Sequence, residues 1–209
     1  MNSKKAMLIG IVVFIIIAIL FVVPGISIFQ KWDIQLLKLV NSSRTPGMTE
    51  FLTSFTTTFK TVPTVVALIC IFYGFIFRKS RLVAKGAILM TTFTSALFFK
   101  DILKLIFTRP RPFVTYDFIN NLAAPTNFSF PSGHTTSAFA AAFIFSFLFP
   151  RQKILCGLFF IWAIIVAYSR PYMGVHYFTD VLGGIFYVLF YSGLIYYGCS
   201  KTILKKAKS

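Results

Sequence analysis

Hydrophobic and polar positions in this chain alternate on the scale of whole helices. Long apolar runs are separated by short segments that hold most of the charged residues. The runs cover residues 6–28, 51–77, 86–107, 133–149, 154–169 and 180–199. Because runs of this kind are typical of membrane-spanning helices, the pattern predicts an all-α fold. We expect a single integral-membrane domain over residues 1–209, built as a bundle of six transmembrane helices.

The segment between the first two runs, residues 29–50, has a different pattern. Apolar residues recur there at helical spacing, namely Trp32, Leu36, Leu37 and Val40. Such an amphipathic segment is expected to lie in the membrane interface. The second run begins with FLTSFTTTFKTVP, which is polar for a lipid-facing surface. Its threonines and Lys60 are expected to face the bundle interior or to lie near its end.

Composition supports a membrane protein and excludes other classes. Of the 209 residues, 57% are hydrophobic and 12% are charged, and the mean hydropathy of +0.80 exceeds that of soluble domains. The net charge of +16 would indicate nucleic-acid binding in a soluble chain. No basic face remains once the spans are removed, so we expect no nucleic acid as a partner.

The cysteines and the N-terminus exclude two further features, a cysteine-based site and a cleaved signal peptide. The three cysteines fall inside the spans without ligand spacing, so we expect neither a disulfide framework nor a zinc site. The first apolar run is too long for the core of a signal peptide, and no A-x-A cleavage site follows it, so we expect a retained span.

The basic residues predict how the bundle is oriented. The N-terminus, the 78–85 segment, the 151–153 turn and the C-terminal tail hold twelve basic residues and no acidic one. By the positive-inside rule this side is the cytoplasm, so both termini are expected there. The outer side then receives the segments at 29–50, 108–132 and 170–179.

The residues that could do chemistry gather on that outer side. The third span ends with Lys104, and the fourth begins with PSGH at residues 131–134. The last two spans flank SRPYMGVHYFTD at residues 169–180. These segments are far apart in sequence but lie at one membrane depth. Short connections between antiparallel helices would let them converge.

His176 and Asp180 are the first candidate pair. They are four residues apart, so they would share a face if both lay on a helical start. A carboxylate bonded to one ring nitrogen fixes the tautomer and leaves the other nitrogen unprotonated, as an oriented nucleophile requires. The alternative is that Asp180 only caps the sixth helix and that His176 is an ordinary loop histidine.

The PSGH segment suits an anion. Ser132 is a favourable N-cap, and Pro131 and Gly133 shape a tight entry to the fourth helix. A helix N-terminus presents free N–H groups and the positive end of the helix dipole, which favour phosphate. His134, in the first turn, could donate a proton to a leaving oxygen. The alternative is plain helix capping.

Three cations, Lys104, Arg111 and Arg170, lie near the same interface. Arginine binds phosphate oxygens in a bidentate manner, and lysine adds a point charge. The alternative is snorkelling to lipid headgroups, although Arg111 and Arg170 each adjoin a proline and are expected to be held by shaped loops. With two histidines and a carboxylate, these cations suit phosphoryl transfer through a phosphohistidine. Carboxylate clusters and Cys/His ligand spacing are missing, so we expect no metal and no cofactor.

Three short motifs carry these residues in a fixed order. K-x6-R-P reads KLIFTRPRP at residues 104–112, P-S-G-H occupies residues 131–134, and S-R-x5-H-x3-D reads SRPYMGVHYFTD at residues 169–180. In order and spacing they resemble the signature motifs of the type 2 phosphatidic acid phosphatase family, whose site is similar to that of the vanadium haloperoxidases. Arg109 offers a second R-P pair, but only Arg111 keeps the six-residue spacing from Lys104.

The resemblance implies a six-helix membrane fold and a metal-independent lipid phosphatase. It implies that His176 attacks phosphorus and becomes a phosphohistidine, and that Asp180 orients it. It also implies that His134 protonates the leaving lipid oxygen and then activates water. The phosphate oxygens would be held by Lys104, Arg111, Ser132, the backbone N–H of Gly133, and Arg170.

The expected partner is a lipid phosphate or diphosphate, because the site is predicted at headgroup level on the outer face. We expect no obligate protein partner. Small bacterial members of the resembled family act on undecaprenyl diphosphate, phosphatidylglycerol phosphate or phosphatidic acid, and the sequence offers no rule for ranking these lipids.

Three alternative functions are open. One is a lipid phosphotransferase that uses the same intermediate. Another is a lipid transporter with a path lined by Lys60, Lys100 and Asp101, although no internal repeat or pair of broken helices supports it. The third is a structural membrane protein without catalysis, which would leave the clustering of both histidines unexplained.

Overall fold

The computed structural model describes residues 3–22 and 27–206, and every regular element within these ranges is a helix. The all-α fold that the sequence predicts is confirmed. The elements are α1 (Ser3–Ile17), the π-helical turn η1 (Ala18–Val22), α2 (Ser27–Ser42), α3 (Pro46–Thr56), α4 (Thr58–Ile76), α5 (Ser80–Phe107), α6 (Pro112–Thr115), α7 (Gly133–Leu148), α8 (Lys153–Tyr172), α9 (Phe178–Lys201) and α10 (Ile203–Lys206).

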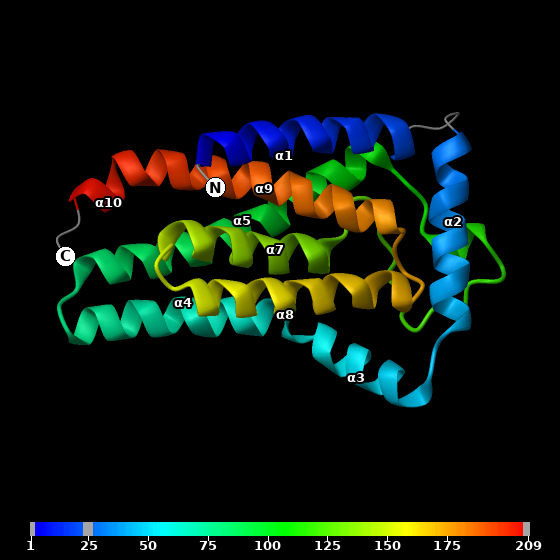
Figure 1. Cartoon of the computed structure of the whole chain (residues 1–209), viewed down its shortest axis with the longest axis horizontal. Coiled ribbons are helices and arrows are strands. Elements are labelled where there is room, and N and C mark those ends of the chain that lie inside the picture. The colour runs from blue at the N-terminus through cyan, green and yellow to red at the C-terminus, as the bar shows by residue number, and fades with distance from the viewer. Residues whose placement is uncertain (1–2, 23–26, 207–209) are drawn as a thin grey trace.

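Five of the described helices are long and apolar enough to cross a membrane, and they run side by side in Figure 1. They are α1, α4, α5, α8 and α9. The sixth, α7, has only 16 residues and packs against α4, α5, α8 and α9. Its alanines at 138 and 140–142 are fully buried, and such small side chains let neighbouring helices approach closely. A helix surrounded by protein in this way is less constrained by the thickness of the lipid.

The second apolar run, residues 51–77, is not one helix. It divides into the end of α3 and the whole of α4, which point in different directions in Figure 1. At the junction Thr57 Oγ1 donates to Ser54 O at 2.7 Å, and Thr58 Oγ1 donates to Phe55 O at 2.7 Å. Hydroxyl groups that compete for backbone carbonyls in this way bend helices. The prediction of a single span from residue 51 is therefore wrong.

The segment at residues 78–85 is also more helical than its charge suggests. Helix α5 begins at Ser80, so Arg81 and Lys85 lie on its first turns instead of in a loop. Arg81 is exposed at the end of the bundle, where a charged side chain does not oppose helix formation.

Two further runs end at different residues from those predicted. Helix α8 continues through Arg170 to Tyr172, although the apolar run ends at residue 169. Arg170 is only 4% exposed, so its charge lies inside the protein and does not end the helix. The first run is also shorter as a helix, because α1 and η1 end at Val22, and residues 23–26 lie outside the described part of the chain.

Helix α2 crosses the end of the bundle instead of running along it (Figure 1). On α2 itself, Leu37 and Val40 are buried, whereas Trp32 and Leu36 are exposed. These four apolar residues therefore do not share one face of the helix. The buried face also carries a carboxylate, Asp33, which is 3% exposed. The helix therefore presents apolar side chains outward and one charge inward.

The long polar segment at residues 108–132 lies beneath α2 and contains one short helix, α6. Near its end the ring of Phe130 packs onto α9 at Gly183, where an added Cβ would lie 2.2 Å from the ring. A larger residue at position 183 would displace Phe130. The glycine thereby fixes the position of Ser129 and of the chain that enters α7.

Candidate active site

A cavity of about 280 Å³ opens where α5 and α8 end and α7 begins. It is lined by Phe59, Lys60, Leu97, Lys100, Asp101, Lys104, Arg111, Pro125, Asn127, Gly133, His134, Arg170 and His176. Six of the eight predicted site residues therefore share one cavity. The other two are Asp180, which lies behind His176, and Ser132, which does not line the cavity.

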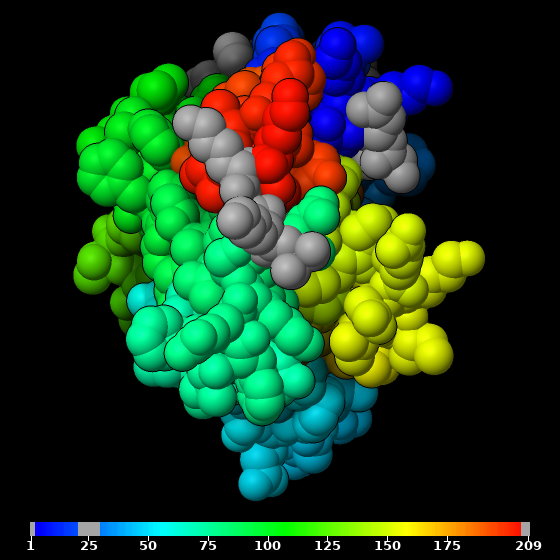
Figure 2. Space-filling view, turned by 90° about the vertical axis from the view of Figure 1, so that its left-hand side faces the viewer, coloured from blue at the N-terminus to red at the C-terminus, as the bar shows by residue number. Residues whose placement is uncertain are grey.

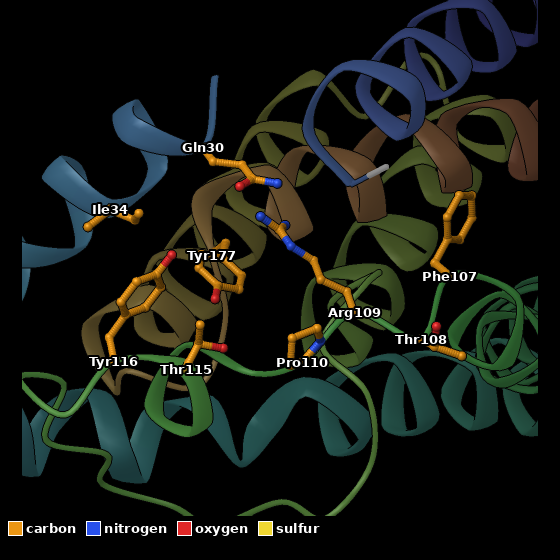
Figure 3. Close-up of a pocket in the computed structure, with 9 residues that line it drawn as sticks. All are labelled: Gln30, Ile34, Phe107, Thr108, Arg109, Pro110, Thr115, Tyr116 and Tyr177. Carbon is orange, nitrogen blue, oxygen red and sulfur yellow. The ribbon is translucent and has the colours of Figure 1, made fainter. Parts of the chain in front are cut away.

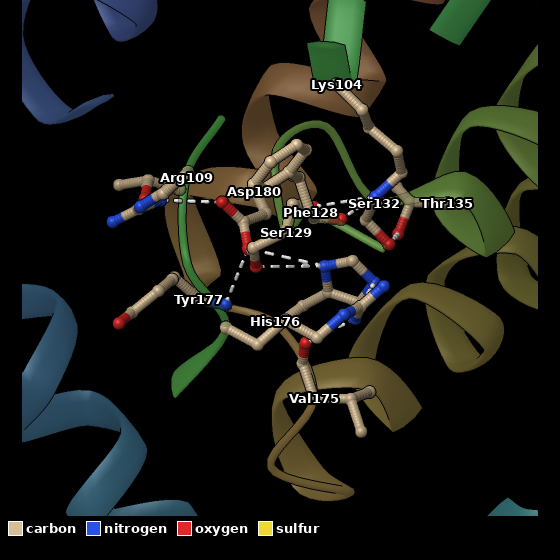
Figure 4. Close-up of polar contacts among 12 residues, drawn as sticks. Lys104, Arg109, Phe128, Ser129, Ser132, Thr135, Val175, His176, Tyr177 and Asp180 are labelled. Carbon is tan, nitrogen blue, oxygen red and sulfur yellow. Dashed lines mark hydrogen bonds and ion pairs between the residues drawn. The ribbon is translucent and has the colours of Figure 1, made fainter. Parts of the chain in front are cut away.

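His176 is held by contacts at both ring nitrogens (Figure 4). Its Nδ1 lies 3.3 Å from Asp180 Oδ2, and its Nε2 lies 3.2 Å from Arg111 Nη1. A carboxylate only accepts hydrogen bonds and a guanidinium only donates them. Both contacts therefore favour the same tautomer, with the proton on Nδ1 and the lone pair on Nε2. Burial is the largest cause that lowers the pKa of His176, to about 3, against the raising effect of Asp180.

Asp180 serves two structural roles at once. Its Oδ2 faces His176 and also accepts a hydrogen bond from the Tyr177 N–H at 2.9 Å, at the start of α9. The capping role and the orienting contact are thus not alternatives. His176 precedes α9, so the pair meets because the chain turns back at Tyr177, and not along one helix face as the spacing suggested. The Ser129 hydroxyl donates to the same carboxylate oxygen and lies 3.5 Å from His176 Nδ1.

Behind Asp180 lies a buried ionic chain that the sequence analysis missed. Arg109 Nη1 donates to Asp180 Oδ1 at 2.6 Å, and its Nη2 donates to Asp33 Oδ2 at 3.0 Å. Asp33 also accepts from the Thr179 N–H at 3.2 Å. Burial raises the pKa of Asp33, although Arg109 opposes this shift. The available signal was a carboxylate in the amphipathic 29–50 segment, four residues before the buried Leu37.

Arg109 borders a second cavity beneath α2, of about 240 Å³ (Figure 3). Arg109 is the only basic residue among the described residues that line it. Its guanidinium is already engaged by two carboxylates and stacks 3.8 Å from the ring centroid of Tyr177. This cavity therefore lacks the uncompensated charge that a phosphate would need.

The three predicted cations are fixed inside the protein. Lys104, Arg111 and Arg170 are 3%, 5% and 4% exposed, so snorkelling to the headgroups does not account for them. Lys104 Nζ contacts the Phe128 carbonyl and lies 3.3 Å from that of Ser129. Arg111 donates to the carbonyls of Asn127 and Val175, both at 2.7 Å.

Arg170 has a buried hydrogen-bond donor that no described residue uses. Its Nη1 lies 3.3 Å from Thr56 Oγ1 and 3.3 Å from Met173 Sδ, while its Nε is buried without a hydrogen-bond partner in the described structure. A buried donor without a partner is costly. An anion in the adjoining cavity would relieve that cost.

The PSGH segment differs in one respect from the prediction. Ser132 is at the N-cap position of α7, but among the described contacts its side chain makes no capping bond and instead accepts from the Thr135 hydroxyl at 3.0 Å. The predicted N-cap position of Ser132 is therefore confirmed, although its side chain does not form the capping bond within the described residues. Gly133 and His134 do line the cavity. The His134 ring packs against Phe59 with centroids 3.7 Å apart and the rings tilted by 32°, and in the described contacts neither ring nitrogen has a hydrogen-bond partner.

The polar residues proposed for a transport path also belong to this cavity. Lys60, Lys100 and Asp101 line it together with both histidines. Lys100 and Asp101 form an ion pair with each other. These residues therefore surround one site and do not mark a separate route across the bundle.

Comparisons with known proteins agree with this geometry. The model of the PAP2 superfamily matches residues 85–203. The undecaprenyl-diphosphatase of Sulfolobus acidocaldarius is 27% identical over 181 residues, which cover 83% of this chain and 82% of that protein.

Two solved structures share the fold. One is a crystal structure of a transmembrane PAP2 type phosphatidylglycerolphosphate phosphatase from Bacillus subtilis, with a TM-score of 0.77, 27% identity, and coverage of 92% of this chain and 95% of that chain. The other is the crystal structure of Aquifex aeolicus LpxE, with a TM-score of 0.59, 28% identity, and coverage of 79% and 94%.

These findings decide the family. The apolar helices and the membrane phosphatases among its relatives make the protein a multi-pass membrane protein. The family resemblance seen in the three motifs is confirmed, as is the expectation of a phosphatase at the level of the family. Since the family model spans more than half of its length, the chain belongs to the PAP2 superfamily.

Proposed function

We propose that this protein is a metal-independent lipid phosphatase that removes a phosphate headgroup through a phosphohistidine at His176. The observation that carries the proposal is the orientation of the His176 ring. Its Nδ1 is held by Asp180, and its Nε2 lone pair is directed to Arg111 in a cavity lined by cations. A neutral, oriented imidazole beside an anion site is the arrangement that nucleophilic attack on phosphorus requires.

In the first step Nε2 of His176 forms a bond to phosphorus while the bond from phosphorus to the lipid oxygen breaks. The electron pair stays on the lipid oxygen, which takes a proton from His134. Asp180 stabilises the positive charge that develops on the ring of His176. Arg111 Nη1, now 3.2 Å from Nε2, is placed to donate to a phosphate oxygen instead.

In the second step water attacks phosphorus and passes its proton to His134, and the phosphorus–nitrogen bond breaks. Free phosphate leaves, and His176 returns to its neutral tautomer. Lys104, Arg111 and Arg170 supply the positive charge for both transition states, and the N–H of Gly133 lies at the start of α7, where the helix dipole favours an anion. Ser132 acts through its position at the helix start.

The proposed orientation places the site outside and both termini in the cytoplasm. Figure 2 views the end of the bundle away from α2, where the α4–α5 turn, the α7–α8 turn and α10 come together. Basic residues are exposed there, including Arg78, Lys79, Arg81, Arg151 and Lys153. This distribution supports a cytoplasmic location for that end. The site lies at the other end, where α5 and α8 end and α7 begins.

The proposed substrates are undecaprenyl diphosphate or phosphatidylglycerol phosphate, with phosphatidic acid as a further candidate. Two relatives support the first two: the undecaprenyl-diphosphatase of Sulfolobus acidocaldarius and the phosphatidylglycerolphosphate phosphatase of Bacillus subtilis. A lipid substrate also suits a cavity that opens where the helices of a membrane bundle end.

The test is phosphate release by the purified full-length protein from a panel of lipid phosphates, in excess chelator and without any lipid acceptor. We expect turnover by the wild-type protein and none by His176→Ala. Release that depends on an added acceptor lipid would instead indicate a phosphotransferase. Activity that disappears with the chelator, or that survives in His176→Ala, would refute the proposal.

A further inference from the structure

Two lysines line the cavity without belonging to any of the three motifs. Lys60 is at the start of α4, and Lys100 is on α5, one helical turn before Lys104. Lys60 is exposed, whereas the side chain of Lys100 is 12% exposed and pairs with Asp101, whose side chain is 58% exposed.

Both lysines lie on the His134 side of the cavity. The ring of Phe59, the neighbour of Lys60, packs against the His134 ring with centroids 3.7 Å apart, and Lys60 Nζ lies 5.3 Å from the centroid of Phe59. The chain of Lys100 packs against the backbone just before His134, since a Cβ added to Gly133 would lie 2.8 Å from Lys100 Cε. His134 is the residue placed to protonate the leaving oxygen.

Two of the motif cations lie on the His176 side. Arg111 contacts Nε2 of His176 directly. Lys104 contacts the carbonyl of Ser129, whose hydroxyl lies 3.5 Å from Nδ1 of the same ring. The cavity therefore has cations beside both histidines, with Lys104 and Arg111 at the nucleophile and Lys60 and Lys100 at the proposed acid.

The charge in the cavity exceeds what a single phosphate needs. Five cations and the Asp101 carboxylate line it, which gives a net charge of +4 before the histidines are counted. A phosphate monoester carries about −1.5 to −2 at neutral pH. A net charge of about +2 therefore remains in the cavity, and Lys60 and Lys100, the latter paired with Asp101, lie in its part next to His134.

We infer that Lys60 and Lys100 form a subsite for a second phosphate, carried by the leaving group. The inference rests on the proposed function. As Nε2 of His176 bonds to the terminal phosphorus, the bond to the bridging oxygen breaks, and that oxygen keeps the electron pair and takes a proton from His134. The leaving group is then itself a lipid phosphate, and the two lysines neutralise its charge.

Two substrate chemistries fit this subsite. In a lipid diphosphate the second phosphate is bonded directly to the bridging oxygen. In phosphatidylglycerol phosphate the second phosphate is a diester several bonds away. Both differ from a lipid monophosphate, whose leaving group is an uncharged alcohol.

The experiment compares kcat/KM of purified wild-type protein and Lys60→Gln/Lys100→Gln on a polyprenyl diphosphate and the monophosphate with the same tail. Phosphatidylglycerol phosphate and phosphatidic acid with matched acyl chains form the second arm. We expect the double variant to lose about tenfold or more on substrates with a second phosphate, and less than about threefold on monophosphates. The arm with the larger loss identifies which second phosphate the subsite binds.

Lys38→Gln is the matched control, because Lys38 is an exposed lysine on α2 that does not line the cavity. Turnover of monophosphate shows that the double variant is folded, and Lys60→Arg/Lys100→Arg should keep the preference. Equal losses on both kinds of substrate, or no loss on either, would overturn the inference. Failure of the proposed function would look different, because the wild-type protein would then release no phosphate or His176→Ala would still release it.

Discussion

The two sides of the His176 ring use the same kinds of residue in opposite ways. On the Nδ1 side Arg109 lies between the carboxylates of Asp180 and Asp33, so its charge is compensated. On the Nε2 side Arg111 is held by neutral carbonyl groups, so its charge is available to a ligand. Two arginines separated by one residue thus serve as a structural support and as an anion site.

This difference teaches that the partners of a buried cation, and not its burial, indicate its role. Arg109 and Arg111 are 8% and 5% exposed. A cation between carboxylates stabilises a fixed geometry, whereas a cation held by carbonyls keeps most of its electrostatic field. Arg170, with a buried Nε that has no partner in the described structure, belongs to the second kind.

The largest expected effect comes from replacing Asp180, the carboxylate that contacts Nδ1 of His176. Asp180→Asn should lower kcat by about 10³- to 10⁴-fold, because an amide NH2 facing Nδ1 favours the wrong tautomer. The protein should remain folded, since the amide oxygen at the Oδ1 position can still accept from Arg109. Phosphate release and thermal unfolding in detergent measure the two effects. Turnover equal to that of the wild type would remove Asp180 from the mechanism.

The two arginines should respond in opposite ways to the same substitution. Arg111→Gln should lower kcat/KM by about 10²- to 10³-fold with a smaller loss of thermal stability than Arg109→Gln, because it releases carbonyl groups and not charges. Arg109→Gln leaves two carboxylates buried without their cation and should lower the free energy of unfolding by about 3–5 kcal/mol. Parallel activity and unfolding measurements test this, and similar stability losses in both variants would contradict the division of roles.

A smaller effect is expected from Asp33, which holds Arg109 from α2. Asp33→Asn keeps an acceptor for the Thr179 N–H but removes the charge, so Arg109 should be drawn closer to Asp180. We expect kcat to fall by about threefold to tenfold, with little change in KM. The pH profile of kcat should also move, which a purely structural role would not cause.

Asp117→Asn is the control for this prediction, because Asp117 is an exposed carboxylate in the 108–132 segment. It should leave kcat, KM and the pH profile unchanged. Identical behaviour of the two variants would show that Asp33 does not position the site.

The smallest effect concerns protonation. Because the pKa of His176 is lowered to about 3, the ring should stay neutral as the pH falls from 7.5 to 5. ¹⁵N NMR of labelled histidine can measure the protonation of this ring. The chain has only two histidines, so the variant His134→Gln would leave His176 as the sole signal. Unfolded chains bind the proton near pH 6.5, so this residue should make folding less favourable as the pH drops below that value. A ring that titrates near pH 6.5 would contradict the burial described here.

The sequence predicted the elements of the fold well where the signal is local. Four of the six apolar runs correspond to helices α5, α7, α8 and α9 with shifted ends, because long apolar stretches report burial in lipid or protein directly. The bend at Thr57 was not predicted, since three consecutive threonines are compatible with a helix until their hydroxyl groups find backbone carbonyls. The continuation of α8 through Arg170 was missed because a buried charge resembles a helix end in sequence.

The candidate site could be predicted from the sequence because its residues lie in three short segments with fixed spacing. The role of Asp33 could not be predicted in this way, since its partners Arg109 and Thr179 are 76 and 146 residues away in the sequence. The N-cap position of Ser132 was predicted, but the missing capping bond was not, because the nearby Thr135 hydroxyl competes with the backbone for its side chain. Pairings across the bundle depend on tertiary packing that local patterns do not contain.

The central claim is a covalent bond between phosphorus and Nε2 of His176. The most direct measurement is rapid quenching of the protein during turnover of a substrate labelled at its terminal phosphate, followed by mapping of the label. We predict acid-labile, alkali-stable label on the peptide that contains His176, and no label in His176→Ala. Steady-state turnover without label on that peptide, or label on the peptide that contains His134 instead, would contradict the account.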